Sequence, residues 1–501
     1  MEVLTNLALG FQTALSWEAL LFCFIGVTVG MLVGVLPGIG ALAAISMTLP
    51  LTFYLEPTVA LIMLAGIFYG AQYGSSTAAI LLNIPGTATA AATCLDGYPM
   101  TRQGKAGVAL FITTISSFIG GTFAILVMIG FAPALAAFAV RFTSADYFSI
   151  MLLGLVAAST LSIGSPLKGI AMVVVGLALG TVGMDRNTGQ MRFTFGQFEL
   201  AEGISLVAVA MGIFGIAEIL KNIGSKHKLV VDRKSITLRS LLPSRAEFKR
   251  SLLPAGRSSI LGSAIGILPG AGPSLAAFMG YALEKKISRD PSKFGKGAIE
   301  GVAAPEAANN ASVQAAFIPT LSLGIPGDAV MAVLIGALMI HGIAPGPLFV
   351  SEQPAMFWGL IASFWIGNLL LLVLNIPMIG LWVRLLTIPY HILFPAMLLF
   401  ICIGVYSVNN NVFDVYIALG FGVVGYFMLM FGFPAAPLLL GFILGPLMEE
   451  NLRRTLTLSR GDPMIFLERP FSAVFLGVAL LLLILTLRSV YRSLPSRQRS
   501  A

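Results

Sequence analysis

Apolar stretches of about 20 residues recur from one end of this chain to the other, and they constrain its fold more than any other feature. Apolar residues make up 57% of the sequence and charged residues only 10%, whereas soluble globular proteins carry about 25% charged residues. Such a stretch spans the bilayer as a helix, which satisfies its own backbone hydrogen bonds. We therefore predict an all-α polytopic membrane protein with roughly 11 to 13 transmembrane or re-entrant helices.

Proline and glycine interrupt these apolar stretches at corresponding places in the two halves of the chain. The first pair of interruptions is Leu36-Pro37-Gly38 and Leu268-Pro269-Gly270, and the second pair is Ile84-Pro85-Gly86 and Ile325-Pro326-Gly327. A transmembrane helix breaks only where protein or a wet cavity satisfies the freed backbone groups, and paired breaks indicate a transporter's substrate site. We therefore expect the broken segments of two repeats to meet near the membrane midplane.

The basic residues divide the chain into a first membrane repeat (1–220), a basic linker (221–257) and a second repeat with a basic C-terminal tail (258–501). The positive-inside rule predicts that the linker and the tail are cytoplasmic. No Lys or Arg precedes Arg102, which favours a periplasmic N-terminus. The two repeats would then enter the membrane from opposite sides, as an inverted repeat.

A further basic cluster between Lys285 and Lys296 follows the second Leu-Pro-Gly break. If this cluster is also cytoplasmic, residues 258–282 enter and leave the membrane on the same side, as a re-entrant helical hairpin with its tip near Pro269-Gly270. Each arm of such a hairpin is too short to span the bilayer. One kinked spanning helix is the alternative, and the sequence leaves both open.

The broken helices predict where a carboxylate substrate binds. The N-terminus of a helix presents free N–H groups and the positive end of the helix dipole to anions. The predicted substrate-binding residues flank the four breaks: Gly38, Ile39, Gly40, Pro85, Gly86, Thr87, Gly270, Ala271, Gly272, Pro326, Gly327 and Asp328.

Oxygen-bearing side chains near the same breaks predict a site for a coupling cation. Hard cations prefer oxygen ligands, and the candidates are Ser75, Ser76, Asn83, Glu306, Asn309, Asn310 and Ser322. Neutral ligands predominate, so sodium is the favoured coupling ion and a proton is the alternative. Small and hydroxyl-bearing residues also let helices pack closely and hydrogen bond to one another. Because Glu306 follows Pro305, it is either an acid in the first turn of a helix or a cation or proton ligand.

The sequence lacks the signatures of an enzyme. His227, His341 and His391 are isolated from one another and form no metal-binding pair. The three cysteines lie alone in apolar stretches. We predict no catalytic residue, no organic cofactor and no tightly bound metal. The basic residues lie in loops beside the lipid bilayer, so we also predict no nucleic-acid partner.

Long motifs in both halves resemble the large membrane subunit, TctA, of the tripartite tricarboxylate transporter family. They are Gly34-Val35-Leu36-Pro37-Gly38, Asn83-Ile84-Pro85-Gly86, Asp96-Gly97-Tyr98-Pro99-Met100, Gly266-Ile267-Leu268-Pro269-Gly270-Ala271-Gly272, Pro305-Glu306-Ala307-Ala308-Asn309-Asn310-Ala311 and Leu323-Gly324-Ile325-Pro326-Gly327. The resemblance covers essentially the whole chain.

This resemblance implies a multi-pass permease subunit of the bacterial inner (cytoplasmic) membrane. Its expected partners are a small, TctB-like membrane subunit and a periplasmic, TctC-like solute-binding protein that delivers a carboxylate. An ion gradient would drive the import of citrate or related di- and tricarboxylates. The alternative function is a channel or uncoupled carboxylate pore.

Overall fold

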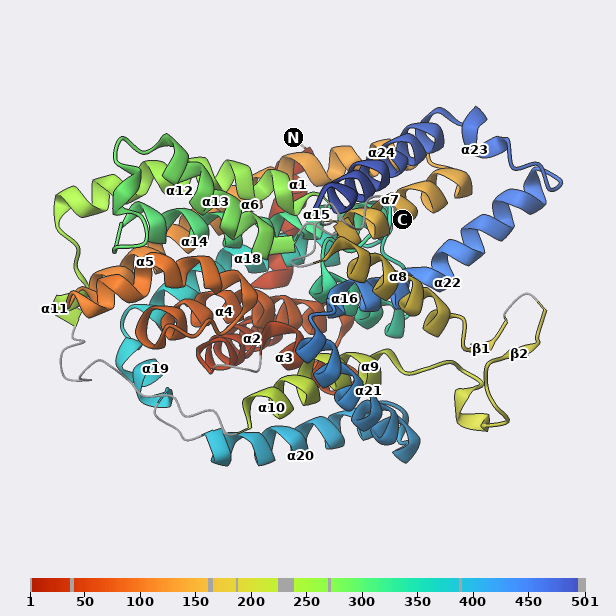
Figure 1. Cartoon of the computed structure of the whole chain (residues 1–501), viewed down its shortest axis with the longest axis horizontal. Coiled ribbons are helices and arrows are strands. Elements are labelled where there is room, and N and C mark those ends of the chain that lie inside the picture. Colours follow the sequence, from red (N-terminus) through yellow and green to blue (C-terminus); the bar gives the residue numbers. More distant parts are fainter. Residues whose placement is uncertain are drawn as a thin grey trace.

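A computed structural model of the chain describes residues 2–36, 40–160, 165–185, 188–223, 238–268, 272–386 and 390–493. Its described elements are helices, apart from one two-stranded antiparallel hairpin in which Gly183 pairs with Arg192. Figure 1 shows the helices packed into one body, with α4 and α2 near its middle. The prediction of an all-α protein is confirmed.

The elements of the first half lead from the N-terminus to the basic linker. They are α1 (Glu2–Ala14), α2 (Trp17–Val35), α3 (Gly40–Thr52), α4 (Pro57–Leu82), η1 (Ala88–Ala90), α5 (Ala91–Arg102), α6 (Ala106–Ala139), α7 (Ser144–Thr160), α8 (Pro166–Gly180), β1 (Gly183–Met184), β2 (Met191–Arg192), η2 (Phe198–Leu200), α9 (Leu206–Ala210), η3 (Met211–Ile216) and α10 (Ala217–Asn222).

The elements of the second half begin within the predicted linker. They are α11 (Leu238–Leu241), α12 (Arg245–Gly266), α13 (Gly272–Ile287), η5 (Pro291–Lys293), α14 (Glu300–Ala315), α15 (Phe317–Leu323), α16 (Ala329–Ile340), α17 (Phe349–Glu352), α18 (Pro354–Asn375), α19 (Ile379–Leu385), α20 (Tyr390–Asn409), α21 (Val412–Phe431), α22 (Ala435–Leu458), α23 (Ile465–Glu468) and α24 (Pro470–Ser493).

Six described helices are long and apolar enough to cross a membrane: α2, α4, α6, α18, α21 and α24. The shorter apolar helices are α3, α7, α8, α16 and the part of α20 from residue 394 to 409. The most apolar window of α4 is 100% buried, whereas that of α24 is only 11% buried. Helix α4 therefore lies at the centre of the protein and α24 at its periphery, consistent with a polytopic membrane protein.

Helix α12 begins earlier than the predicted boundary of the second repeat. Ser244 and Glu247 form a reciprocal capping box that starts the helix at Arg245. Residues 245–257 of the predicted linker are therefore helical, while residues 224–237 lie outside the described part of the chain.

Helices α12 and α13 pack against each other as a hairpin, so the alternative of one kinked helix is wrong. The Arg257 guanidinium of α12 donates two hydrogen bonds, of 2.8 and 2.7 Å, to the Glu284 carboxylate of α13. Because these residues lie on opposite sides of the break and far from it along the chain, the two helices must run antiparallel. The predicted tip near Pro269-Gly270 lies outside the described residues.

The two halves repeat one packing arrangement. In each half, glycines of the helix before the Leu-Pro-Gly motif lie directly against carbonyl oxygens of the helix that leads to the Ile-Pro-Gly motif. The pairs are Gly26 with Met63, Gly30 with Ile67 and Gly34 with Ala71 in the first half, and Gly262 with Ala308 and Gly266 with Ser312 in the second. Glycine permits this close approach because it has no Cβ atom.

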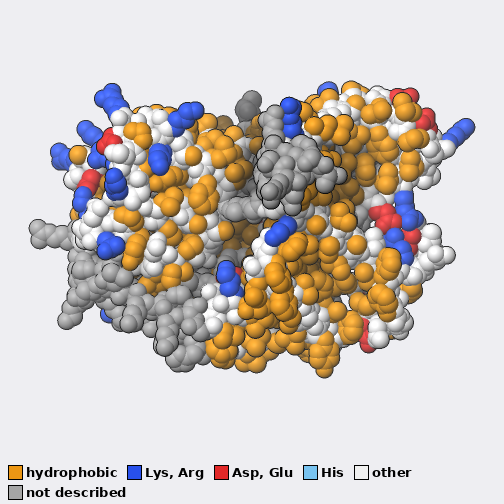
Figure 2. Space-filling view, viewed as in Figure 1, with side chains coloured by type: hydrophobic (Ala, Val, Ile, Leu, Met, Phe, Trp, Pro, Cys, Tyr) orange, Lys and Arg blue, Asp and Glu red, His pale blue; other side chains and the backbone are white. Residues whose placement is uncertain are grey.

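Basic side chains gather at the end of the molecule that carries α11 and the start of α12, at the left of Figure 2. Lys105 pairs with Glu247 at 2.9 Å, and Arg250 and Lys293 both pair with Glu300. These ion pairs bring three basic segments, distant in sequence, to one end of the protein. Hydrophobic side chains cover much of the remaining surface in the same view, as expected of a surface that faces lipid.

Candidate substrate and cation site

The first broken helix meets the second half of the chain at the Gln72 side chain. Gln72, on α4, is 3% exposed, and its Oε1 atom accepts a hydrogen bond of 2.7 Å from the Thr89 hydroxyl. The same atom accepts longer hydrogen bonds from the Thr87 hydroxyl, at 3.5 Å, and the Asn309 amide, at 3.3 Å. These neutral polar groups thus line the start of the η1–α5 helical segment, directly after the first Ile-Pro-Gly break.

Glu306 lies on α14 beside this neutral cluster and is 1% exposed. Its Oε1 atom accepts a hydrogen bond of 2.6 Å from Thr93 on α5, and its Oε2 atom accepts one of 3.1 Å from Ser117 on α6. No ion pair to Glu306 is found among the described residues. An unpaired carboxylate at this depth is costly unless it binds a cation or a proton.

The interpretation of Glu306 as a first-turn acid is wrong. Helix α14 begins at Glu300, which is the acid in its first turn, and Pro305 lies inside the helix. Proline is disfavoured inside helices and common at their first turn, which is why Pro305 suggested a helix start. Glu306 instead faces the helices of the first half.

Asn310 belongs to the same cluster of polar side chains as Glu306. Its amide Nδ2 donates to the Ser117 hydroxyl at 2.8 Å and to the Glu306 backbone carbonyl at 3.1 Å. Ser76, on α4, also interacts with the Glu306 carboxylate. Four helices (α4, α5, α6 and α14) therefore bring oxygen atoms to one buried place, and oxygen-rich sets of this kind suit a hard cation such as sodium.

The other predicted cation ligands lie outside this polar group. Ser75 donates to the Gln72 backbone carbonyl at 2.8 Å, and Ser322 donates to the Ala132 carbonyl at 3.1 Å. Asn83 is exposed and ends α4 in a left-handed conformation, with φ 57°. Asparagine tolerates that conformation better than most residues, so the observed role of Asn83 is to terminate the helix.

Some of the predicted substrate-binding residues lie outside the described part of the chain, and the others lie at helix starts or beside the Ile-Pro-Gly breaks. Gly38, Ile39, Gly270 and Ala271 lie outside the described residues, whereas Gly40 and Gly272 begin α3 and α13. Pro85 is exposed, Gly86 is buried and Thr87 is half-buried, while Pro326 and Gly327 are both buried.

Asp328 acts as the N-cap of α16. Its carboxylate accepts a hydrogen bond of 2.9 Å from the Met331 backbone N–H. A Cβ atom added to Gly272 would lie 3.9 Å from the Asp328 Cβ atom, so Asp328 also adjoins the start of α13. An acid at a helix N-terminus occupies the position that a substrate carboxylate would take.

The sequence analysis did not predict Gln72 as a ligand and gave no role to Thr93 or Ser117. Gln72 and Ser76 are four residues apart, which places them on one helix face. That spacing was a usable signal. Thr93 and Ser117 carried no such signal, because single hydroxyls in membrane helices usually bond within or between helices.

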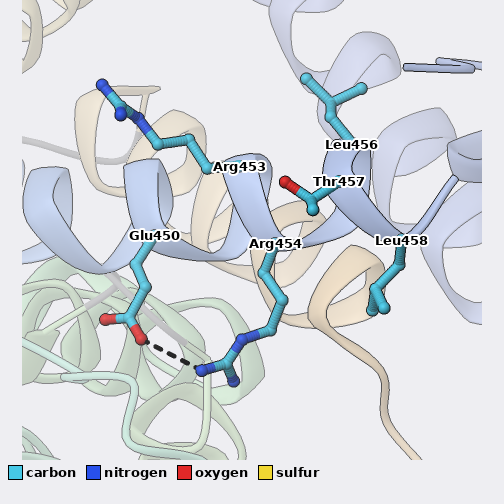
Figure 3. A pocket seen from close by; sticks show the side chains of 6 residues that line it. All are labelled: Glu450, Arg453, Arg454, Leu456, Thr457 and Leu458. Carbon is cyan, nitrogen blue, oxygen red and sulfur yellow. Dashed lines mark hydrogen bonds and ion pairs between the residues drawn. The ribbon is translucent and has the colours of Figure 1, made fainter. Parts of the chain in front are cut away.

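A surface hollow of about 590 Å³ lies at the end of α22 and is shown in Figure 3. It is lined by Glu450, Arg453, Arg454, Leu456, Thr457 and Leu458. All of its lining residues belong to one helix end, and none belongs to a broken helix. We therefore do not assign substrate binding to this hollow.

The family model of the tripartite tricarboxylate transporter TctA family matches residues 20–440. The chain belongs to the TctA family. It is therefore a multi-pass membrane component of a tripartite tricarboxylate transporter, and the family is one of transporters rather than enzymes. The resemblance expected from the motifs is confirmed.

Two curated relatives of this TctA family member come from Agrobacterium vitis. The uncharacterized 52.8 kDa protein in the TAR-I ttuC' 3'region is 52% identical over 493 residues, which cover 98% of each chain. The uncharacterized protein in the TAR-II ttuC' 3'region is 56% identical over 232 residues, or 46% of this chain and 96% of the relative. No solved structure matches the chain.

Proposed function

We propose that this TctA family subunit imports citrate or related di- and tricarboxylates across the bacterial inner membrane, coupled to sodium. A periplasmic, TctC-like binding protein delivers the substrate, and a TctB-like membrane subunit completes the transporter. This proposal rests on the polar side chains between the first Ile-Pro-Gly break and Glu306. Among them, candidate ligands for an anion and for a cation lie close to one another.

The start of the η1–α5 segment supports the anion half of the proposal. Thr87 and Thr89 place hydroxyl groups there, which donate to Thr89 and to Gln72, and Thr87 makes no capping hydrogen bond to the backbone. The first backbone N–H groups of a helix attract anions when no side chain occupies them. A carboxylate is thus the substrate group that this position suits.

The surroundings of Glu306 support the cation half. Thr93 links Glu306 to α5, the helix whose start is the candidate anion position. A cation bound at Glu306 would therefore influence the helix that binds the substrate. This arrangement can couple two ligands without direct contact between them.

The decisive experiment is uptake of labelled citrate into proteoliposomes that contain this chain and its two partners. We expect uptake to fall at least tenfold when choline replaces sodium at fixed pH. Unlabelled citrate inside the vesicles should accelerate entry of labelled citrate by counterflow, because a carrier exchanges its cargo whereas a channel does not. Uptake that persists in choline but collapses with the pH gradient would assign the coupling to protons.

Matched substitutions on α14 test the cation site. We expect Glu306→Gln to raise the sodium concentration for half-maximal uptake at least tenfold, and Asn310→Ala to raise it less. Glu300→Gln is the control, because Glu300 pairs with Arg250 and Lys293 near the basic end of the protein. Equal sodium dependence in Glu306→Gln and Glu300→Gln would remove Glu306 from the cation site.

A further inference from the structure

Two buried oxygen atoms on α14 lack hydrogen-bond partners. Asn309 is 1% exposed and Ser312 is fully buried, and neither the Asn309 Oδ1 atom nor the Ser312 hydroxyl has a partner among the described residues. The two residues are three positions apart, so their side chains lie on one face of the helix, with Cβ atoms about 5–6 Å apart. A buried polar atom without a partner is unfavourable, and one bound group can reach both oxygens.

The Asn309 amide is held in one orientation. Its Nδ2 atom donates to Gln72 Oε1 at 3.3 Å, and the same oxygen accepts a hydrogen bond from the Thr89 hydroxyl at 2.7 Å. Because Gln72 Oε1 can only accept, Asn309 must present its amide nitrogen there and turn its own Oδ1 atom away. Oδ1 is also only an acceptor, so a cation or a hydrogen-bond donor satisfies it, and a carboxylate does not.

The first repeat packs in the same way without polar residues at these two positions. Ala71 corresponds to Ser312, because each lies against the last glycine before a Leu-Pro-Gly motif. Three residues earlier, Phe68 corresponds to Asn309, and both Phe68 and Ala71 are buried. Close packing of these helices therefore requires neither an amide nor a hydroxyl, which favours a ligand-binding role for the polar pair.

The C-terminal end of α12 lies beside this pair. Helix α12 ends at Gly266, and a Cβ atom added to Gly266 would lie 2.8 Å from the Ser312 Cα atom. The last carbonyl groups of a helix lack partners within it and carry the negative end of the helix dipole. Ends of broken helices coordinate sodium in other transporters, so a cation suits this place better than a neutral donor.

We propose that Asn309, Ser312 and the C-terminal end of α12 bind a second sodium ion, distinct from the one at Glu306. The two places differ in their surroundings, because Glu306 bonds to α5 and α6 whereas Ser312 lies against α12.

The charge of the cargo gives a second cation a physical purpose. A membrane potential that is negative inside opposes the entry of a di- or tricarboxylate, and each cation that enters with it offsets one charge. This inference rests on the proposed function, and it adds that the coupling ions occupy two sites.

Sodium-dependent stabilisation of the purified full chain tests the second site in the absence of substrate. We expect sodium, compared with choline at equal ionic strength, to raise the unfolding temperature of the wild-type chain. Glu306→Gln should keep part of this rise, and adding Ser312→Ala to it should remove the remainder. Ser312→Ala should fold, because alanine occupies the corresponding position of the first repeat.

Ser259→Ala is the matched control. Ser259 is a buried serine of α12 whose hydroxyl is already bonded to the Ala255 carbonyl at 2.7 Å. Its replacement should leave the sodium effect on the unfolding temperature unchanged.

Citrate uptake in proteoliposomes with both partners gives a second measurement. The Hill coefficient for sodium is bounded by the number of coupled sites, and we expect it to fall from about 2 in the wild type to about 1 in Ser312→Ala. Asn309→Ala should have the same effect, and Ser259→Ala should have none.

Complete loss of sodium stabilisation in Glu306→Gln alone would overturn the second site. Wild-type sodium dependence in both Ser312→Ala and Asn309→Ala would also overturn it, because water would then be the group that satisfies the two oxygens. Wild-type uptake that does not depend on sodium would instead contradict the coupling ion of the proposed function.

Discussion

Among the acidic residues, Asp96 should contribute most to the attachment of α5 to the second half of the chain. It is fully buried, and its Oδ1 atom accepts hydrogen bonds from the backbone N–H groups of Gly295, Gly297 and Ala298 at 2.9, 2.7 and 2.7 Å. Its Oδ2 atom accepts a hydrogen bond of 2.9 Å from the Tyr281 hydroxyl. Asp96→Ala removes all four bonds.

The magnitude of this loss follows from the exposure of the donors. A hydrogen bond to a charged group contributes about 1.5–3 kcal/mol. Gly295 is exposed and Gly297 is half-buried, so water can replace part of their bonds, whereas Ala298 and Tyr281 are buried. The hydrogen bonds from the two buried donors should therefore contribute their full free energy, and the other two only a small part of it. We expect Asp96→Ala to lower the free energy of unfolding by about 4 kcal/mol.

Two milder substitutions provide graded controls. Asp96→Asn keeps an oxygen for the backbone N–H groups but loses the charge, and we expect a loss of about 2 kcal/mol. Tyr281→Phe removes one hydrogen bond to the carboxylate, and we expect a loss of about 1.5 kcal/mol. Uptake should fall in the same order, because displacing α5 also displaces Thr93, which lies three residues before Asp96. The Thr93 hydroxyl donates a hydrogen bond to the Glu306 carboxylate.

The assay is thiol labelling of Ala298→Cys in a background without Cys23, Cys94 and Cys402. Ala298 is 5% exposed, so the thiol should react slowly when Asp96 is present. We expect Asp96→Ala to accelerate labelling at least tenfold and to lower the unfolding temperature in detergent. Unchanged labelling and an unchanged unfolding temperature would refute the role of Asp96 as the link between α5 and this loop.

The remaining predictions concern single positions. Asn83→Gly should preserve stability, whereas Asn83→Ala should cost about 1 kcal/mol in thermal unfolding, because only the former suits a left-handed residue; equal effects would contradict this. Gly266→Ala should destabilise the protein by about 1–3 kcal/mol, since its Cβ would collide with a backbone carbonyl, while Gly256→Ala on the same helix meets open space and should be neutral or stabilising. The ammonium of Lys105, together with the Ser244 backbone N–H, lowers the pKa of Glu247 to about 2, so this acid stabilises the fold above its ordinary pKa and loses that contribution as pH falls towards 2. Glu247→Gln should therefore lower the unfolding temperature at pH 7 but not at pH 2, by an amount equivalent to about 1 kcal/mol; an equal effect at both values would count against the ion pair.

The sequence alone determined that this is an all-α membrane protein of the TctA family. Apolar stretches long enough to span a bilayer leave helices as the structure that satisfies every backbone group locally. The Pro-Gly motifs likewise marked the ends of α4 and α15, because local backbone chemistry decides where a helix stops. These features depend on neighbours in sequence, so a single chain reveals them.

Only the tertiary structure decided which polar residues meet. Glu306 and Asn83 both looked like cation ligands, yet Glu306 contacts Thr93 and Ser117 in the other half of the chain, whereas Asn83 is exposed at a helix end. Asp96 was part of a recognised motif, but its partners lie about 200 residues away, in the loop before α14. Side-chain partners at such separations are set by how helices pack, and the hydrogen-bonding capacity of a residue does not say which distant segment will satisfy it.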